Sequence, residues 1–474
     1  MKKNIVAAFA LVFALASCNS QLDDINTNPN ATEHPLPAYL LTGTLKQGAD
    51  LYWGADNNFN SSLLFVQQWA KIQYTEPDRY DVSNTSFTTL WNTGYATLIT
   101  DLNTILNFTD EEAHSNYKGV ALALRSWVFQ LLTDAYGDIP YSEAGQKTTP
   151  KYDAQRDVYL GLLNDLKTAQ SLLSTSGEKI EGDVVYDGSI AKWKKFVNSL
   201  RLRIALRIAD RESDLAKQEV TAVVADAAGL IDNNAGNFQF VYTSSPQQNP
   251  ASAWFETRDD FRVSKTLVDK LKALSDPRLA VYAQLPTDES VTTYVGAANG
   301  LSNSEANNQG FAKTSKPGTY FLTSESPAVI LSYAEVQFSL AEAVARGFIS
   351  GNADTYYKEG ITASFKQFGV TDATVIATYL SQPAVLYNAA NYKESIGLQK
   401  WIAFYGQGLD AFAEWRRLDY PQLTAGVSTV LDGKMPSRFF YPGTEQSLNG
   451  INYKLAVSSQ GPDLLTTRLW FDVN

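Results

Sequence analysis

Apolar residues recur at steps of three and four along much of the chain, which predicts a mainly helical protein. The clearest case is Arg156–Leu173, where apolar side chains would line one face of a helix. Similar periodicity predicts helices over Tyr95–Leu106, Tyr117–Tyr136, Ile190–Ile208, Val329–Val344, Thr355–Phe368 and Leu409–Arg417. Strictly alternating patterns, which would indicate strands, are scarce.

The predicted helices follow one another in pairs that resemble degenerate tetratricopeptide repeats, although no regular 34-residue period is present. Long stretches rich in Asn, Ser, Thr, Gly, Pro and Tyr separate them: Asn233–Trp254, Leu285–Thr323 and Asp432–Gln460. Irregular segments of this length are uncommon in compact domains and are often functional. The pattern therefore predicts a helical-repeat scaffold carrying long irregular loops and few short strands, with binding residues in the loops.

The first 17 residues have the features of an export signal. Lys2 and Lys3 precede an apolar run, Ile5–Ala16, that is shorter than the roughly 20 residues of a membrane-spanning helix. Leu15-Ala16-Ser17-Cys18 resembles the lipobox of bacterial lipoproteins, and Cys18 is the only cysteine. An ordinary signal peptide beside a free thiol is the alternative, but lipid attachment explains the lone cysteine. We expect a signal peptide over residues 1–17, a lipidated tether over 18–34 and one helical domain over 35–474.

Charge and composition exclude several functions. A formal net charge of −11 argues against nucleic-acid binding and against electrostatic adhesion to anionic lipid. The two histidines, His34 and His114, lack the neighbours of a catalytic triad or a zinc site. No run of carboxylates has the spacing of a calcium loop. We therefore expect no metal and no cofactor.

Six segments, in a fixed order, carry a resemblance to a known family. They are the lipobox-like start with Ile25–Asn30, "LTDAYGDIPYSEA" (Leu132–Ala144), "VILSYAEVQFSLAEAVARG" (Val329–Gly347), "AFAEWRRLDYP" (Ala411–Pro421), Met435–Tyr453 and "LWFD" (Leu469–Asp472). Together they resemble the SusD/RagB family of outer-membrane nutrient-binding lipoproteins. Phe261–Leu279 and Tyr294–Ser302 resemble its SusD-like type two branch, whereas Ser332 replaces an arginine usual in the family.

The resemblance implies a binding protein and not an enzyme. Its members lie on the outside of the outer membrane, capture oligosaccharide and pass it to a SusC-like TonB-dependent barrel transporter. Peptide capture for such a transporter is one alternative. A glycoside hydrolase is a weaker one, because no segment forms a recognisable acid/base signature. Glu335 and Glu342 would share one helix face, but such pairs are routine in helices, and Arg416 and Arg417 are expected to bridge helices.

Ligand-binding candidates are aromatic, arginine and aspartate residues in polar or loop settings. Aromatic residues make up 12% of the chain, and flat rings suit the apolar faces of sugars. Tyr52 and Trp53 precede the polar segment "GADNNFN", so we expect them to be exposed. The full set is Tyr52, Trp53, Tyr74, Arg79, Trp254, Arg258, Asp259 and Tyr294. Packing in the core is the alternative for each, and it is the interpretation we prefer for Trp91, Trp127, Trp193 and Trp401.

Overall fold

The computed structural model describes residues 36–108 and 114–473, and most of this part of the chain is α-helical. The expected signal peptide and the tether that carries Cys18 lie outside the described residues. The longer helices are α3 (Pro37–Trp53), α7 (Ser115–Tyr136), α8 (Gln155–Leu172), α9 (Ile190–Arg207), α10 (Ser213–Ala225), α16 (Tyr333–Ala345), α17 (Ala353–Gln367), α19 (Tyr392–Ala403), α20 (Gly408–Leu418) and α22 (Gly450–Gln460). The shorter ones are α4 (Leu63–Phe65), α5 (Thr88–Thr93), α6 (Thr100–Leu106), α11 (Pro250–Phe255), α12 (Lys265–Ala273), α13 (Leu279–Tyr282), α14 (Asn303–Asn308), α15 (Thr319–Leu322), α18 (Ala373–Leu380) and α21 (Gly443–Leu448).

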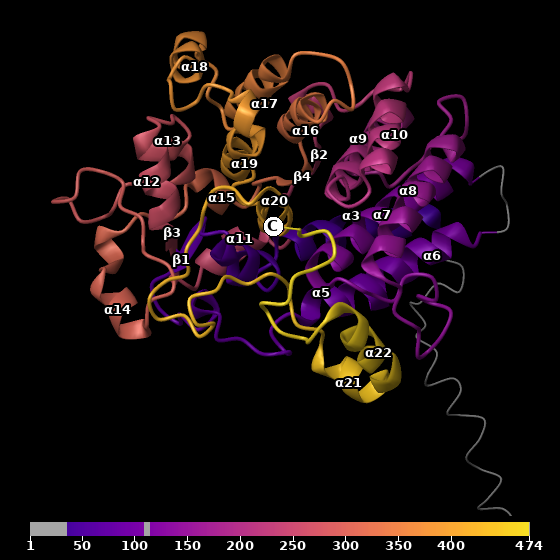
Figure 1. Cartoon of the computed structure of the whole chain (residues 1–474), viewed down its shortest axis with the longest axis horizontal. Helices are drawn as coiled ribbons and strands as arrows, with labels where there is room; N and C mark the ends of the chain where they lie inside the picture. Colours follow the sequence, from indigo (N-terminus) through magenta and orange to yellow (C-terminus); the bar gives the residue numbers. More distant parts are fainter. Residues whose placement is uncertain (1–35, 109–113, 474) are drawn as a thin grey trace, which may run out of the picture.

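Helices that follow one another in the chain pack as neighbours, which confirms the predicted helical scaffold. α7 packs on α8, α9 on α10, and α16 on α17. Figure 1 shows α6 to α10 gathered at one end of the molecule and α12 to α14 at the other, with α16, α17 and α19 between them. Gly360 permits the close approach of α16 and α17, because a Cβ there would lie 2.8 Å from the Phe338 ring.

Most of the predicted helices are confirmed to within two residues at each end. The predicted helix Tyr95–Leu106 is a π-helix over Gly94–Ile99 that continues into α6, and one other predicted helix is partly wrong. Val329–Val344 was expected to be continuous, whereas Ala328–Leu331 forms strand β4 and α16 starts at Tyr333. The four residues of β4 are all buried, and a short apolar run of this kind is compatible with a buried strand as well as with a helix. Ser332 separates the two elements, and its Oγ accepts a hydrogen bond from Glu335 N at 3.1 Å.

The strands of the described residues form two small antiparallel pairs. β1 (Trp69–Lys71) pairs with β3 (Phe261–Val263), and β2 (Phe238–Phe240) pairs with β4. The long stretches expected to be irregular are therefore more ordered than predicted. Asn233–Trp254 contains β2 and most of α11, Leu285–Thr323 contains α14 and α15, and Asp432–Gln460 contains α21 and α22. Apart from α22, these elements are too short for periodicity to identify them, and α22 buries only Ala456 among its 11 residues, so it has no continuous apolar face.

α7 is buried on nearly all sides and belongs to a hydrophobic core that extends from α3 to the carboxyl-terminal segment. The four tryptophans assigned to the core, Trp91, Trp127, Trp193 and Trp401, are at most 5% exposed. Gly137 ends α7 with a φ of 88°, and a Cβ there would overlap Gln460 Oε1. The glycine in "AYGDIPY" is thus explained by backbone conformation and close packing.

Candidate ligand-binding site

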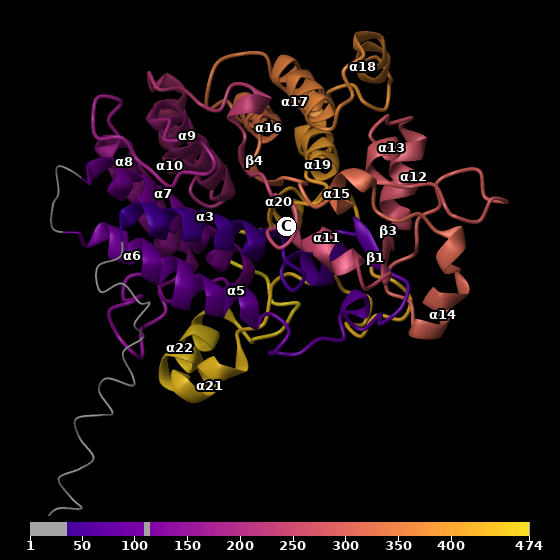
Figure 2. The same cartoon turned by 180° about the vertical axis from the view of Figure 1, so that it is seen from behind.

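The pairing of β1 with β3 brings two predicted ligand-binding segments together. The strands are antiparallel, with Lys71 at the end of β1 opposite Phe261 at the start of β3. The loop that leaves β1 carries Tyr74, and the segment that enters β3 carries Trp254 and Arg258. Figure 2 shows α11, β1 and β3 side by side. Residues 180 positions apart in sequence therefore meet at one surface.

Tyr74, Trp254 and Arg258 form an aromatic platform. The Arg258 guanidinium carbon lies 4.5 Å from the centre of the Trp254 ring and 5.2 Å from that of Tyr74. Tyr74 is 56% exposed, Trp254 is half-buried, and the Arg258 side chain is 41% exposed. The platform thus offers ring surface and guanidinium donors at the protein surface, and three of the predicted residues belong to it.

Asp260, which the sequence did not single out, holds the platform from beneath. Its buried carboxylate accepts hydrogen bonds from Trp254 Nε1 at 3.0 Å and from Arg258 Nη2 at 3.2 Å, and it forms an ion pair with Lys71 Nζ at 2.6 Å. Burial alone would raise the pKa of Asp260, but Lys71 and these hydrogen bonds outweigh it and lower the pKa. The carboxylate is therefore ionised, and it fixes both the indole and the guanidinium.

Tyr74 adopts a backbone conformation that few tyrosines tolerate. Its φ is 54°, in the left-handed region, which costs a non-glycine residue on the order of 1–3 kcal/mol. The next residue is anchored, since Thr75 N donates to Asn303 Oδ1 at 3.0 Å. Such strain is concentrated at binding and active sites, so it supports a functional assignment for this exposed ring.

A layer of buried aromatic rings lies under Trp254. Phe59 packs edge-on against Trp254, with ring centres 5.4 Å apart, and against Phe261 at 5.3 Å. Trp69 packs against the same two phenylalanines. Trp254 is therefore rigidly supported, which lowers the entropy lost when a ligand stacks on it.

Three other predicted residues lie outside the platform. Arg79 Nε donates to Ser428 O at 2.8 Å, which ties the Tyr74 segment to a loop near the carboxyl end. Asp259 forms ion pairs with Arg262 at 2.8 Å and with Lys316 at 3.0 Å. Tyr294 packs against the core and is partly buried. The structure gives these residues local contacts, and their contact with a ligand stays a prediction.

The expected exposure of Tyr52 and Trp53 is wrong. α3 continues to Trp53 and turns both rings into the core, where Tyr52 is 0% and Trp53 3% exposed. Tyr52 Oη donates to Asp410 Oδ2 at 2.6 Å, and Trp53 Nε1 donates to Val329 O at 3.3 Å. Both residues are structural, because a ligand cannot reach them in this conformation.

The two glutamates of α16 do not form a carboxylate pair for catalysis. Glu335 accepts from Arg203 Nε at 2.6 Å, and Glu342 accepts from Arg417 Nη1 at 2.5 Å. Both glutamates are buried and bound to arginine. Arg417 joins α20 to α16 through Glu342, while Arg416 donates to Asp134 O in α7 at 2.8 Å. The predicted bridging role of the two arginines is confirmed.

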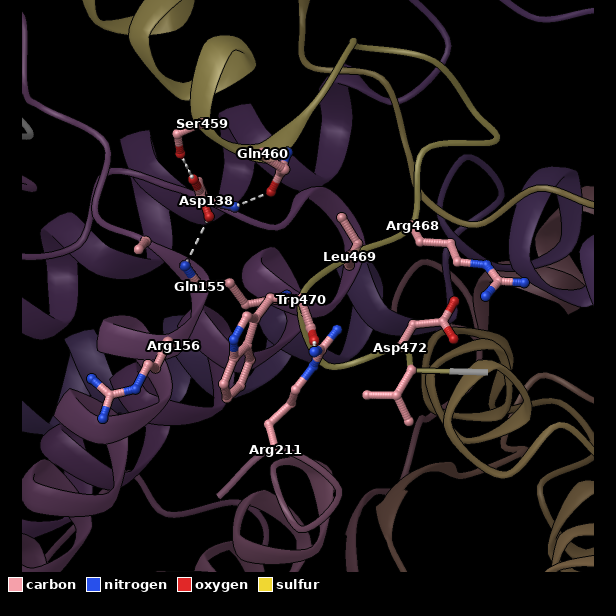
Figure 3. Close-up of a pocket in the computed structure, with 12 residues that line it drawn as sticks. Asp138, Gln155, Arg156, Arg211, Ser459, Gln460, Arg468, Leu469, Trp470 and Asp472 are labelled. Carbon is pink, nitrogen blue, oxygen red and sulfur yellow. Dashed lines mark hydrogen bonds between the residues drawn. The ribbon is translucent and has the colours of Figure 1, made fainter. Parts of the chain in front are cut away.

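A cavity of about 450 Å³ lies where the carboxyl-terminal segment meets the start of α8. Figure 3 shows Trp470 between Arg156 and Arg211, with Asp138 above them beside Ser459 and Gln460. Asp138 accepts from Gln155 N and Ser459 Oγ, and Arg211 donates to Trp470 O. These bonds join α22 and the start of α8 to the segment that follows α7, and the end of the chain to the turn between α9 and α10. The cavity contains none of the predicted ligand residues, so we assign the "YGDIPY" and "LWFD" contacts here to structure.

Two features of other protein classes are missing from residues 36–108 and 114–473. No group of three or more histidine, cysteine or acidic residues there is placed to hold a metal ion. No helix in that part of the chain is long and apolar enough to cross a membrane.

Comparison with known proteins gives a consistent family assignment. Residues 29–442 match a SusD-like family model described as starch-binding and associating with the outer membrane. A solved chitin-binding protein is 32% identical, with 93% of this chain and 100% of that chain covered and a TM-score of 0.84. A chitin-binding SusD homologue from Flavobacterium johnsoniae is 25% identical, with 92% and 99% covered and a TM-score of 0.82. A SusD homologue from Bacteroides uniformis is 26% identical, with 92% and 100% covered and a TM-score of 0.84. A search of curated proteins found no match.

Proposed function

Since this chain belongs to the SusD-like family of carbohydrate-binding, outer-membrane-associated proteins, we propose that it captures oligosaccharide at the aromatic platform without cleaving it. The observation that carries the proposal is the grouping of Tyr74, Trp254 and Arg258 at the surface over the buried carboxylate of Asp260. In this proposal Cys18 carries the lipid anchor, the domain faces the cell exterior, and a SusC-like TonB-dependent barrel receives the ligand.

The first ligand to test is an oligosaccharide of N-acetylglucosamine. Two of the similar structures are named as chitin-binding, and one of them is 32% identical to this chain. The platform suits such a ligand because the rings can cover the apolar face of a sugar. The Arg258 guanidinium can donate to a hydroxyl or acetamido oxygen. Starch fragments are the second choice, from the description of the family.

The size of the site predicts modest affinity. A sugar ring stacked on an aromatic side chain buries about 100 Å² of apolar area, worth about 2–3 kcal/mol at ~25 cal/mol/Å². Ordering of the ligand and desolvation of its hydroxyls offset much of this gain. Two rings and a few hydrogen bonds should therefore give a Kd in the micromolar range or weaker.

Tyr74→Ala tests the proposal directly. Because Tyr74 is exposed, the variant should fold normally but bind chitohexaose at least about tenfold more weakly, measured by calorimetry on the chain from Asn19 onward. Tyr39→Ala is the matched control, since Tyr39 is 71% exposed on α3, outside the platform.

Equal affinity in the two variants would refute the platform as the binding site. Binding of a peptide mixture, together with no measurable binding of any glycan, would support the peptide-capturing alternative. Release of reducing ends from any polysaccharide would support the hydrolase alternative instead.

A further inference from the structure

We propose that a second cavity binds a neutral sugar unit at a site separate from the aromatic platform. This cavity has a volume of about 430 Å³ and lies between α6, α7 and the loop that follows Pro140. We call it the α6–α7 cavity. It shares no residue with the platform, and its volume is within the range of roughly 300–1,000 Å³ typical of ligand pockets. Its lining includes Asn103, Asn107, Arg125, Tyr141, Ser142 and Gln146.

The cavity presents amide groups that have spare hydrogen-bonding capacity. Asn103 Oδ1 accepts from Arg125 Nη1 at 3.1 Å, which orients the amide, and its Nδ2 has no acceptor among the described residues. Asn107 makes no side-chain hydrogen bond in that part of the chain, and Gln146 makes only a long one, 3.4 Å, to Ser142 O. Donors and acceptors are thus both available, as hydroxyl-rich ligands require.

The charges around the cavity are already neutralised, which favours an uncharged ligand. Arg125 forms an ion pair with Asp165 at 3.2 Å, and Tyr141 Oη donates to the same carboxylate at 2.8 Å. Ser142 Oγ donates to Asp153 at 2.9 Å. An anionic or cationic ligand would have to compete with these pairs, whereas a neutral polyol leaves them intact.

The walls of the cavity are rigid. The Tyr141 ring packs edge-on against buried Phe129, with centres 4.9 Å apart. Gly145 has a φ of 74°, and a Cβ there would lie 2.9 Å from Asn103 Nδ2. The Nε–H of Arg125 is buried without an acceptor among the described residues, as expected where a bound water completes the hydrogen bonding.

The α6–α7 cavity also accounts for part of a motif that the platform leaves unused. Tyr141 and Ser142 belong to "LTDAYGDIPYSEA", and Gly145 follows it directly. The glycine and proline of the motif shape the end of α7, whereas these later residues line the cavity. Two sites on one chain would let a polymer bind at both, which raises its apparent affinity above that of a short ligand.

The test is the number of short sugars bound per chain at saturation. Equilibrium dialysis with labelled diacetylchitobiose and maltotriose should give two per chain for the unaltered protein. Trp254→Ala should leave one, and so should the double variant Asn107→Ala/Gln146→Ala, while the combination should leave none. The double variant should also lower affinity for soluble chitin by about tenfold. Asn308→Ala, an exposed amide on α14, is the matched control and should leave two.

Each pattern of results distinguishes this proposal from the proposed function. One sugar per chain, lost completely in Trp254→Ala, would overturn the second site and uphold the platform. One sugar per chain, lost only in Asn107→Ala/Gln146→Ala, would overturn the platform as a binding site and uphold the α6–α7 cavity. No binding to the unaltered protein, or tighter binding of glucuronate than of neutral sugars at this cavity, would overturn the assignment.

Discussion

At the scale of single residues, Asp260 decides the geometry of the aromatic platform. It bonds Trp254, Arg258 and Lys71 at once, and both Asp260 and Lys71 are almost completely buried. Asp260→Asn should lower oligosaccharide affinity by about fivefold or more, because the indole and guanidinium lose a shared charged acceptor. It should also reduce the free energy of unfolding by about 3–5 kcal/mol, since Lys71 becomes a buried, unpaired cation. Calorimetric titration and urea unfolding measure the two effects.

A second substitution separates the two consequences for Asp260. Lys71→Met/Asp260→Asn removes both charges, so it should regain stability without regaining affinity. Asp269→Asn on α12 is the matched control, because this carboxylate is 54% exposed and its ion pair with Lys265 lies at the surface, so the substitution should change affinity and stability little. Full recovery of affinity in the double variant would show that Asp260 acts only through folding and does not position Trp254.

The sequence identifies the exposed residues of the platform better than the residues that support them. Tyr74, Trp254 and Arg258 could be predicted because aromatic and cationic residues in polar segments are unusual. Asp260 could not be told from Asp259, since only the pairing of β1 with β3 decides which carboxylate faces Lys71. The predicted exposure of Tyr52 and Trp53 was wrong for a related reason. Their burial depends on residues distant in the chain, such as Asp410.

At the scale of elements, the apolar periodicity predicted the long helices, whereas no sequence pattern predicted the strands. α7, α8, α9 and α17 are long enough for a 3.6-residue pattern to emerge. β1 to β4 are three or four residues long, and each depends on a partner at least 88 residues away in the chain. The second cavity was missed for the same reason, because it combines α6, α7 and a loop.

The junction between β4 and α16 gives a prediction at the scale of the element. The Ser332 side chain caps α16, so Ser332→Ala should lower the free energy of unfolding by about 0.5–2 kcal/mol. Ser332→Thr keeps the oxygen and should recover most of the loss. Thermal unfolding of the three proteins measures the effect. Equal loss in both variants would indicate that packing around this buried residue, and not the cap, is what matters.

At the scale of the whole molecule, a buried network of ion pairs joins the helices. Arg207 in α9 contacts Glu414 in α20 at 2.9 Å, and Arg203 in α9 contacts Glu335 in α16 at 2.6 Å. Arg417 in α20 contacts Glu342 in α16. Removing one member of such a pair is costly, since the other is left as an uncompensated buried charge. The network thus fixes how α9, α16 and α20 pack, which the apolar pattern of each helix alone does not.

Acid sensitivity follows from this network. Burial alone would raise the pKa of Glu342, but Arg417 and Arg346 outweigh it and lower the pKa to about 2. The ordinary value is 4.5, so ionised Glu342 stabilises the fold by about 3 kcal/mol above pH 4.5. This stabilisation is lost as the pH falls toward 2.

Glu342→Gln tests the sign and the pH range of that effect. Urea unfolding at pH 7 should show a loss of about 3–5 kcal/mol in the free energy of unfolding. The difference from the unaltered protein should narrow by about 2 kcal/mol at pH 3, where most of the stabilisation by ionised Glu342 has been lost. Glu325→Gln, at an exposed position, should match the unaltered protein at both pH values. A difference between Glu342→Gln and the unaltered protein that stays constant with pH would mean that hydrogen-bond acceptance, and not the ionisation of Glu342, is what this residue contributes to the packing of α16 on α20.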